Sequence, residues 1–298
     1  MCSQSNIKVH FVLGDGNRFA AICRAAKVEY ALFSCYGYIK NKSSQQNMKV
    51  NNLRETKSGF KHVIMDSGLF TLMFGADKNK EQTPEFIREW MHRICRFVQD
   101  NNIHASIVEC DCQKLISPEY AWELRQEMRD LLPDREIINV FHLEDGKDGF
   151  EQLVDFTDYL AISVPELRIA QPKTYRKTVC ALARKAKRMK PNIKIHLLGC
   201  TEKYLLEHNR FCTSSDSSSW TSGCRYGSFD KNNHISSIKP EMKALAIDRI
   251  KHAAKHLDVT LKKEWVNPDS TTYTWMAGNY WAAVYCRENY IRWAGNQD

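Results

Sequence analysis

The segment VIMDSG (Val63–Gly68) is a short apolar run that ends in a carboxylate, Asp66, followed by two small residues. The segment FCTSSDSSSW (Phe211–Trp220) follows the same plan, with Asp216 in the equivalent place. Short apolar runs between turn signals are typical of buried strands. A carboxylate at the C-terminal end of such a strand is where parallel α/β enzymes position catalytic groups. Either aspartate could instead cap the next turn or helix, so the other strands decide between these interpretations.

Short β-rich runs alternate along the chain with segments of helical periodicity. The predicted strands are Ile7–Leu13, Glu29–Ser34, His62–Met65, Ala105–Cys110, Glu136–His142, Tyr159–Val164, Lys194–Leu198 and Phe211–Ser214. Proline in the first turn marks helix starts at Pro84, Pro118 and Pro240, as is usual at helix N-termini. Alternating strands and helices predict a parallel sheet. Eight strands favour the α/β class with a closed (β/α)8 TIM barrel, and no Gly-x-Gly-x-x-Gly follows the first strand to indicate a dinucleotide fold.

The chain is predicted to form a single domain. Residues 1–266 suffice for a (β/α)8 barrel, which typically needs ~250 residues. Residues 267–298 are rich in aromatic side chains and are predicted to form a C-terminal helical extension that packs on the barrel. The alternative for this segment is stacking on a flipped base or a single strand.

Composition limits the classes of partner and compartment. A formal net charge of +8 favours a polyanionic partner. The chain has eleven cysteines, no export signal and no apolar run long enough for a membrane span. We therefore expect a cytoplasmic protein with reduced thiols (host cytoplasm if phage-encoded) and no membrane partner. The helix predicted over residues 172–190 carries many basic and no acidic side chains, so it either contacts phosphates or is a solvated face.

Polar or acidic groups follow six consecutive predicted strands. They lie at Asp66, at Glu109 and Asp111, at His142, at Ser163, at Gly199 and at Asp216. The C-terminal ends of barrel strands form the active-site face, so these groups are expected on one rim. Two carboxylates facing one pocket suggest one nucleophile and one proton carrier.

The order of these segments resembles the tRNA-guanine transglycosylases and their DNA-modifying relatives. The matching segments are VIMDSGLF (63–70), ECDC (109–112), VFHLEDG (140–146), LAISVPE (160–166) and HLLGCT (196–201). From Asp216 to Thr221, Arg225 and Gly227, the spacing matches the family's Asp-x4-Thr-x3-Arg-x-Gly without a gap. That spacing is the most specific of the matches, and the likeness covers roughly residues 62–227.

The resemblance implies a pentosyltransferase that exchanges guanine for a 7-deazaguanine base. It assigns Asp216 as the nucleophile and Asp66 as the proton carrier. The residues implied to bind the base are Glu109, Asp111, His142, Ala161, Ser163 and Gly199, with His142 standing where the family has a glutamine. Arg225 and Thr221 are implied to contact nucleic acid. For His142 the alternative is a hydrogen-bonded rim residue without base contact.

Two departures from the family pattern bear on metal and substrate. The tRNA enzymes carry a zinc site of three clustered cysteines and a histidine beyond the nucleophile, whereas only Cys224 and Cys286 lie there in this chain. We therefore expect no structural zinc and no cofactor. We also expect no additional RNA-binding domain after the barrel, and with the serine-rich segment 214–220 around Asp216 the chain looks most like the DNA 7-deazaguanine transglycosylases of phages and bacteria. The expected partners are DNA and the free 7-deazaguanine base, with the oligomeric state left open.

Three other functions compete with base exchange in DNA. The first is the same exchange on tRNA. The second is a catalytically silent barrel that binds nucleic acid, which would have no need for both Asp66 and Asp216. The third is a carbohydrate hydrolase with two carboxylates, in which the base-binding motifs would have no role.

Overall fold

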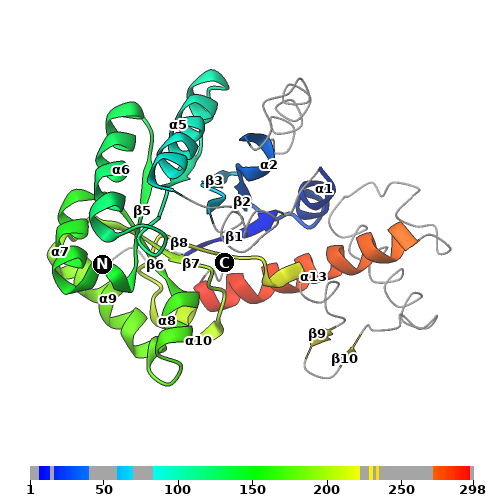
Figure 1. The fold of residues 1–298 in the computed structure, drawn as a ribbon. Coiled ribbons are helices and arrows are strands. Elements are labelled where there is room, and N and C mark those ends of the chain that lie inside the picture. Colours follow the sequence, from blue (N-terminus) through cyan, green and yellow to red (C-terminus); the bar gives the residue numbers. More distant parts are fainter. Residues whose placement is uncertain are drawn as a thin grey trace.

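The eight predicted strands form a closed parallel barrel in the computed structural model (Figure 1). The structure describes residues 7–13, 17–39, 59–69, 83–221, 228–230, 233–234 and 271–295. Each strand pairs with the next along the chain, and the last pairs with the first. The strands are β1 (Lys8–Leu13), β2 (Tyr30–Ser34), β3 (His62–Asp66), β4 (Ser106–Val108), β5 (Ile137–Phe141), β6 (Tyr159–Ser163), β7 (Lys194–Leu198) and β8 (Ser214–Ser217). The predicted (β/α)8 fold is confirmed.

Helices surround the barrel and connect its strands. They are α1 (Asn17–Ala25), α2 (Tyr36–Ile39), α5 (Pro84–Asp100), α6 (Pro118–Leu131), α7 (Gly146–Phe156), α8 (Val164–Ala170), α9 (Tyr175–Met189), α10 (Lys203–His208) and α13 (Thr271–Ala294). Short 3-10 turns, η1 (Leu143–Asp145) and η2 (Ser219–Thr221), follow β5 and β8, and β9 (Ser228–Asp230) pairs antiparallel with β10 (Asn233–His234). None of the described helices combines the length and apolarity needed to cross a bilayer.

The starts of α5 and α6 follow directly from their sequences. Thr83 Oγ1 accepts a hydrogen bond from the Phe86 amide, and Ser117 Oγ accepts one from the Tyr120 amide. A capping side chain followed by proline satisfies the free amides of the first turn. The apolar face of α5 then packs against β3 and β4 through Ile87, Trp90, Met91, Ile94, Cys95 and Val98.

The last barrel strand differs from its predicted position. The apolar residues before Ser214 were expected to form the strand, but β8 is the polar stretch Ser214–Ser217. Cys212 instead closes a turn, because its amide donates to the carbonyl of Asn209. Ser214 is fully buried inside the barrel and hydrogen-bonds to His196. The barrel interior therefore holds paired polar side chains, where the sequence suggested an apolar core.

Helix α13 completes the outer wall of the barrel. It packs against α1, α10, η2 and β1 (Figure 1), which is the place of an eighth barrel helix. Tyr280 and Tyr290 belong to the main buried cluster, and the Tyr290 ring lies 5.5 Å from that of Phe11. The helix predicted from Pro240 lies outside the described residues. The C-terminal segment, which was predicted as an extension packed on the barrel, thus forms a helix of the barrel wall.

Gly199 makes the tight turn after β7. Its φ is +64°, and a Cβ atom there would lie 2.6 Å from Cγ of Pro165, a rigid ring. Gly59 also has a positive φ, +87°, but a Cβ atom there would meet only the flexible Arg24 side chain, at 3.1 Å. Only glycine adopts such backbone conformations without strain.

We expect Gly199→Ala to destabilise the protein more than Gly59→Ala. Both variants place a side chain at positive φ, which costs roughly 1–2 kcal/mol. Gly199→Ala should lose about 1–3 kcal/mol more, because its methyl group overlaps the Pro165 ring. Urea unfolding of both variants measures the difference. Equal losses would show that the Pro165 ring can move away from the new methyl group without any loss of stability.

Candidate active site

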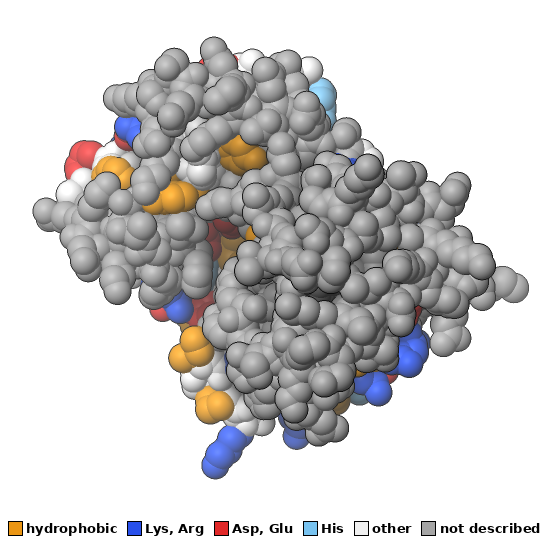
Figure 2. Space-filling model, turned by 90° about the vertical axis from the view of Figure 1, so that its right-hand side faces the viewer, with side chains coloured by type: hydrophobic (Ala, Val, Ile, Leu, Met, Phe, Trp, Pro, Cys, Tyr) orange, Lys and Arg blue, Asp and Glu red, His pale blue; other side chains and the backbone are white. Residues whose placement is uncertain are grey.

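Three carboxylates meet at the C-terminal end of the barrel. Asp66 ends β3, Asp111 follows β4, and Asp216 is the third residue of β8. They lie close enough that the charges of Asp111 and Asp216 both act on Asp66. Figure 2 views the molecule from the side toward which β1 points in Figure 1, and acidic side chains are visible in a hollow there. The structure thus brings Asp66 and Asp216 to the same end of the barrel.

Asp216 is held through one of its two carboxylate oxygens. Oδ1 accepts hydrogen bonds from Nε2 of His196 (3.0 Å) and from the amide of Gly199 (2.8 Å). Among the described residues, Oδ2 has no hydrogen-bond partner, and Asp216 is 5% exposed. A carboxylate that is fixed at one oxygen and free at the other can direct the free oxygen at a bound substrate. This geometry suits the predicted nucleophile.

Asp66 has a different electrostatic environment from Asp216. Burial and the negative charge of Asp111 raise the pKa of Asp66 to about 7, with a smaller contribution from Asp216. The amide of Gly68 donates to Oδ2 (3.0 Å) and offsets part of this rise. A carboxyl with a pKa near neutrality can both give and take a proton. A carboxyl whose pKa is raised by burial and by a neighbouring charge is typical of acid–base sites.

His142 is clamped between two carboxylates. Its Nδ1 lies 2.8 Å from Oε2 of Glu166, and its Nε2 lies 3.0 Å from Oδ2 of Asp111. Burial lowers the pKa of His142, but these two hydrogen bonds and charges outweigh it and raise the pKa to about 10. His142 is therefore an imidazolium that donates from both nitrogens. His142 is thus hydrogen-bonded at the rim, where it holds Oδ2 of Asp111.

Glu166 and Lys114 complete this cluster and were not predicted as site residues. Lys114 Nζ lies 2.8 Å from Oε1 of Glu166, which also accepts from the amide of Leu143 (3.2 Å). Burial raises the pKa of Glu166, but His142 and Lys114 lower it to about 2 overall. Glu166 lies just after the end of β6, so its position at a strand end was the available signal. No feature of the sequence predicts that Lys114 belongs to this cluster.

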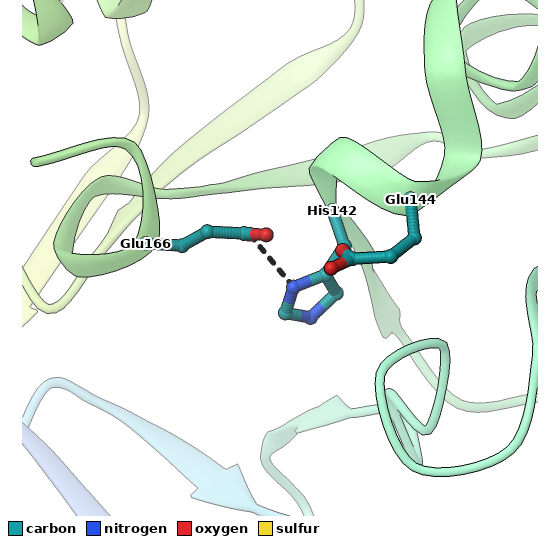
Figure 3. A group of neighbouring side chains, drawn as sticks. All are labelled: His142, Glu144 and Glu166. Atoms are coloured by element: carbon teal, nitrogen blue, oxygen red, sulfur yellow. Dashed lines mark hydrogen bonds and ion pairs between the residues drawn. The ribbon is translucent and has the colours of Figure 1, made fainter. Parts of the chain in front are cut away.

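The same cluster has the atoms of a possible metal site. His142, Glu144 and Glu166 each offer a ligand atom, all within 4.8 Å of one another (Figure 3). However, Nδ1 of His142 already lies within hydrogen-bond distance of Glu166 (2.8 Å), and a metal bound there would have to replace this hydrogen bond and displace its proton. The geometry thus favours a hydrogen-bonded cluster. The thiols of Cys110 and Cys112 are also poor ligands here, because burial raises the pKa of each; Cys224 lies outside the described residues.

Glu109 supports the barrel wall, in contrast to its predicted contact with a base. Its carboxylate accepts from Nε (2.9 Å) and a terminal nitrogen (2.8 Å) of Arg125, and from the amide of Val140 (2.8 Å). The Asn139 side chain donates to it as well. The side chains of Glu109 and Arg125 are 3% and 2% exposed. Every acceptor direction is used within the protein, which leaves none for a ligand.

The other predicted site residues are distributed as follows. Ala161 is buried in the middle of β6, where its backbone pairs with β5 and β7. Ser163 ends β6 at the rim and is 8% exposed. Gly199 contacts Asp216 through its amide. Thr221 lies in η2, where its hydroxyl donates to the carbonyl of Ser218 (2.8 Å). Arg225 lies outside the described residues.

Comparison with known protein families finds no family model that matches this chain, and comparison with curated proteins finds no matching sequence. The interpretation of the site accordingly depends on its own geometry.

Asp66→Asn is expected to stabilise the protein more at pH 8 than at pH 4. The folded-state pKa of Asp66 is raised from 3.8 to about 7. A raised carboxyl pKa contributes stability below the unfolded pKa, and this is lost as the pH rises through the folded pKa. Asparagine cannot ionise and avoids that loss. Thermal unfolding at both pH values measures the effect, with the exposed Asp134→Asn as control. An equal shift at both pH values would contradict the raised pKa.

Arg125→Met is expected to cost about 3–5 kcal/mol of stability, because it leaves the Glu109 carboxylate buried without its cation. Adding Glu109→Gln should recover part of this loss. The matched control is Arg96→Met, since Arg96 makes an exposed ion pair with Glu89, and exposed pairs contribute at most ~1 kcal/mol. Urea unfolding compares the variants. Similar losses for Arg125→Met and Arg96→Met would refute the structural role of the buried pair.

Proposed function

We propose that this protein exchanges guanine in DNA for a 7-deazaguanine base through a covalent bond between Asp216 and C1′ of the deoxyribose. One observation carries the proposal: two carboxylates, Asp66 and Asp216, lie at the same end of the barrel in different environments. Among the described residues, Oδ2 of Asp216 has no hydrogen-bond partner, and the pKa of Asp66 is raised to about 7. The strand-end motifs support the same reaction through their resemblance to the transglycosylases.

In the first half of the reaction, Oδ2 of Asp216 attacks C1′ while the bond from C1′ to the guanine nitrogen breaks. The carboxylate stabilises the oxocarbenium-like charge and then forms an ester, as in retaining glycosidases. The departing guanine carries the electron pair of the broken bond and takes a proton from Asp66. A pKa of about 7 keeps a large share of Asp66 protonated at neutral pH for this step.

In the second half, the incoming 7-deazaguanine replaces guanine in the same pocket. Ionised Asp66 removes the proton from its ring nitrogen, and that nitrogen attacks C1′. The ester bond breaks, and Asp216 leaves as a carboxylate. Two displacements at C1′ retain its configuration, and Asp66 returns to its protonated form. Both half-reactions use only the two carboxyl groups and the two bases, so the proposed scheme calls for no cofactor.

Asp111 is the group best suited to recognise the base. His142 holds its Oδ2, while among the described residues Oδ1 has no hydrogen-bond partner. Its side chain is 20% exposed, so a ligand can reach it. Guanine and 7-deazaguanines present adjacent N–H donors on their Watson–Crick edge, and a carboxylate is a pure acceptor that suits them. Adenine presents a ring acceptor there and would be repelled.

DNA is the proposed macromolecular substrate on the basis of the net charge of +8 and the likeness to the DNA-directed enzymes. Helix α9 and the residue after it offer fewer free cations for DNA phosphates than the sequence suggests. Arg176, Lys185 and Lys190 form ion pairs with acidic partners on neighbouring segments: Glu202, Glu151 and Asp158. Neutralised cations cannot release counterions from a phosphate backbone. Only the remaining cations of α9 are available to contact phosphates.

The proposal is tested by denaturing electrophoresis of the protein mixed with guanine-containing DNA or with tRNA. We expect a covalent band with DNA that disappears when the incoming base is added. Asp216→Asn should abolish the band, because an amide is a poor nucleophile. Asp66→Asn should slow its formation by ~10²–10⁴-fold, the usual contribution of general acid catalysis. A band with tRNA alone would identify tRNA as the substrate, and a band that persists in Asp216→Asn but not in Asp66→Asn would reverse the two roles.

The pH profile of adduct formation should report Asp66. Because the first step needs its protonated form, the rate should fall as the pH rises above about 7, the pKa of this carboxyl. Asp66→Asn should lose that alkaline limb and keep a low, flat rate. Single-turnover measurements on both sides of this pKa determine the two profiles. An alkaline limb that remains in Asp66→Asn would assign the proton transfer to another group.

A further inference from the structure

A chain of buried polar side chains leads from the barrel interior to Asp216. His196, in β7, is fully buried and lies between Asp216 and Ser214. Its Nε2 is 3.0 Å from Oδ1 of Asp216, and its Nδ1 is 2.6 Å from Oγ of Ser214. The Ser214 hydroxyl also hydrogen-bonds to the hydroxyl of Tyr159, in β6. Three neighbouring strands thus supply the chain Tyr159–Ser214–His196–Asp216.

The hydrogen bonds of this chain have one consistent direction. Oδ1 of Asp216 accepts from the amide of Gly199 and faces Nε2 of His196, so Nε2 is the donor in this chain. In the Nε2–H tautomer of His196, Nδ1 accepts from the Ser214 hydroxyl, whose oxygen in turn accepts from the Tyr159 hydroxyl. Burial raises the pKa of Tyr159 well above its usual range, so this hydroxyl remains a donor. Ser214 and Tyr159 therefore select the tautomer of His196 that donates to Asp216.

The neighbouring histidines add no positive charge beside this chain. The ring of His10, in β1, lies 6.4 Å from that of His196. Burial, together with His196 and His62, lowers the pKa of His10 well below its usual range. Its Nε2 contacts Nδ1 of His62 at 2.9 Å, and burial also lowers the pKa of His62. The two neighbouring histidines thus favour their neutral forms, and burial of His196 in the barrel strengthens its hydrogen bond to the carboxylate.

We propose that His196 is a positioning residue for Asp216, and that Ser214 and Tyr159 fix its tautomer. Together with the Gly199 amide, His196 holds Oδ1 so that Oδ2 is the oxygen presented to C1′. This role rests on the proposed function of Asp216 as nucleophile. The side chain of His196 need not touch the substrate, because it acts through the orientation of the carboxylate.

Two amide variants of His196 separate positioning from space filling. The amide nitrogen of glutamine reaches about as far as Nε2 of histidine, so His196→Gln can still donate to Asp216. Asparagine reaches only about as far as Nδ1, so His196→Asn loses that donor while its amide can still bond to Ser214. Both variants place a polar amide of similar chemistry in the same buried site. Their difference therefore reports the hydrogen bond to Oδ1.

The kinetic test measures single-turnover adduct formation with guanine-containing DNA. Losing a hydrogen bond to a charged group should slow His196→Asn by about 10- to 100-fold, whereas His196→Gln should retain most of the rate. DNA affinity, measured by fluorescence anisotropy in the Asp216→Asn background, should be the same with and without His196→Asn. Melting temperatures of both variants control for folding. A rate for His196→Asn equal to that of the wild-type protein would overturn the proposal.

A second measurement does not depend on catalysis. Nitrogen-15 NMR of the imidazole side chains in the intact protein should show His196 as the Nε2–H tautomer with a hydrogen-bonded Nδ1. The milder variants Ser214→Ala and Tyr159→Phe should shift the Nδ1 signal, and Asp216→Asn should shift the Nε2 signal. An Nδ1–H tautomer in the wild-type protein would refute the positioning chain even if no adduct forms. Absence of an adduct with the expected NMR pattern would instead refute the proposed function alone.

Discussion

Pairing between β1 and β8 is the constraint on which the candidate site depends. The parallel register from Lys8 beside Ser214 to Phe11 beside Ser217 joins segments from the two ends of the described barrel. An open sheet would place β3 and β8 far apart, and Asp66 and Asp216 would then belong to different edges. Closure brings the strand ends into one ring. It also makes an interior from which water is excluded.

A closed interior requires that every polar group within it has a partner, because burying an unpaired polar group costs several kcal/mol. This requirement applies to Ser214, which β8 places inside the barrel. Ser214 is tolerated inside the barrel because it is bonded to Tyr159 and His196. Barrel interiors are more commonly filled by branched apolar residues. The polar interior here leads to Asp216, and we propose that it orients this carboxylate.

Charge is distributed unevenly around the rim. His142 and Lys114 compensate Glu166 and Asp111, whereas Asp66 accepts a hydrogen bond from Gly68 but sits beside two further carboxylates. A cluster of like charges is unfavourable for stability, and with burial it raises the pKa of Asp66 to about 7. Such local conflicts between stability and charge are characteristic of functional sites. Asp66 and Asp216 thus differ in their hydrogen bonds and in the charges beside them, because their surroundings in the barrel differ.

The sequence by itself determined the features that are local in the chain. The alternation of strands and helices follows from hydrophobic periodicity, and the starts of α5 and α6 follow from Thr83 and Ser117, because caps and periods need only neighbouring residues. The carboxylates near the strand ends could also be identified from the sequence. Tertiary structure alone decided the contacts between distant segments. These are the pairing of Glu109 with Arg125, the polar strand β8, the place of α13 in the wall, and the hydrogen bond from His196 to Asp216. They depend on strand register and barrel closure, which place side chains from distant parts of the chain within hydrogen-bond distance.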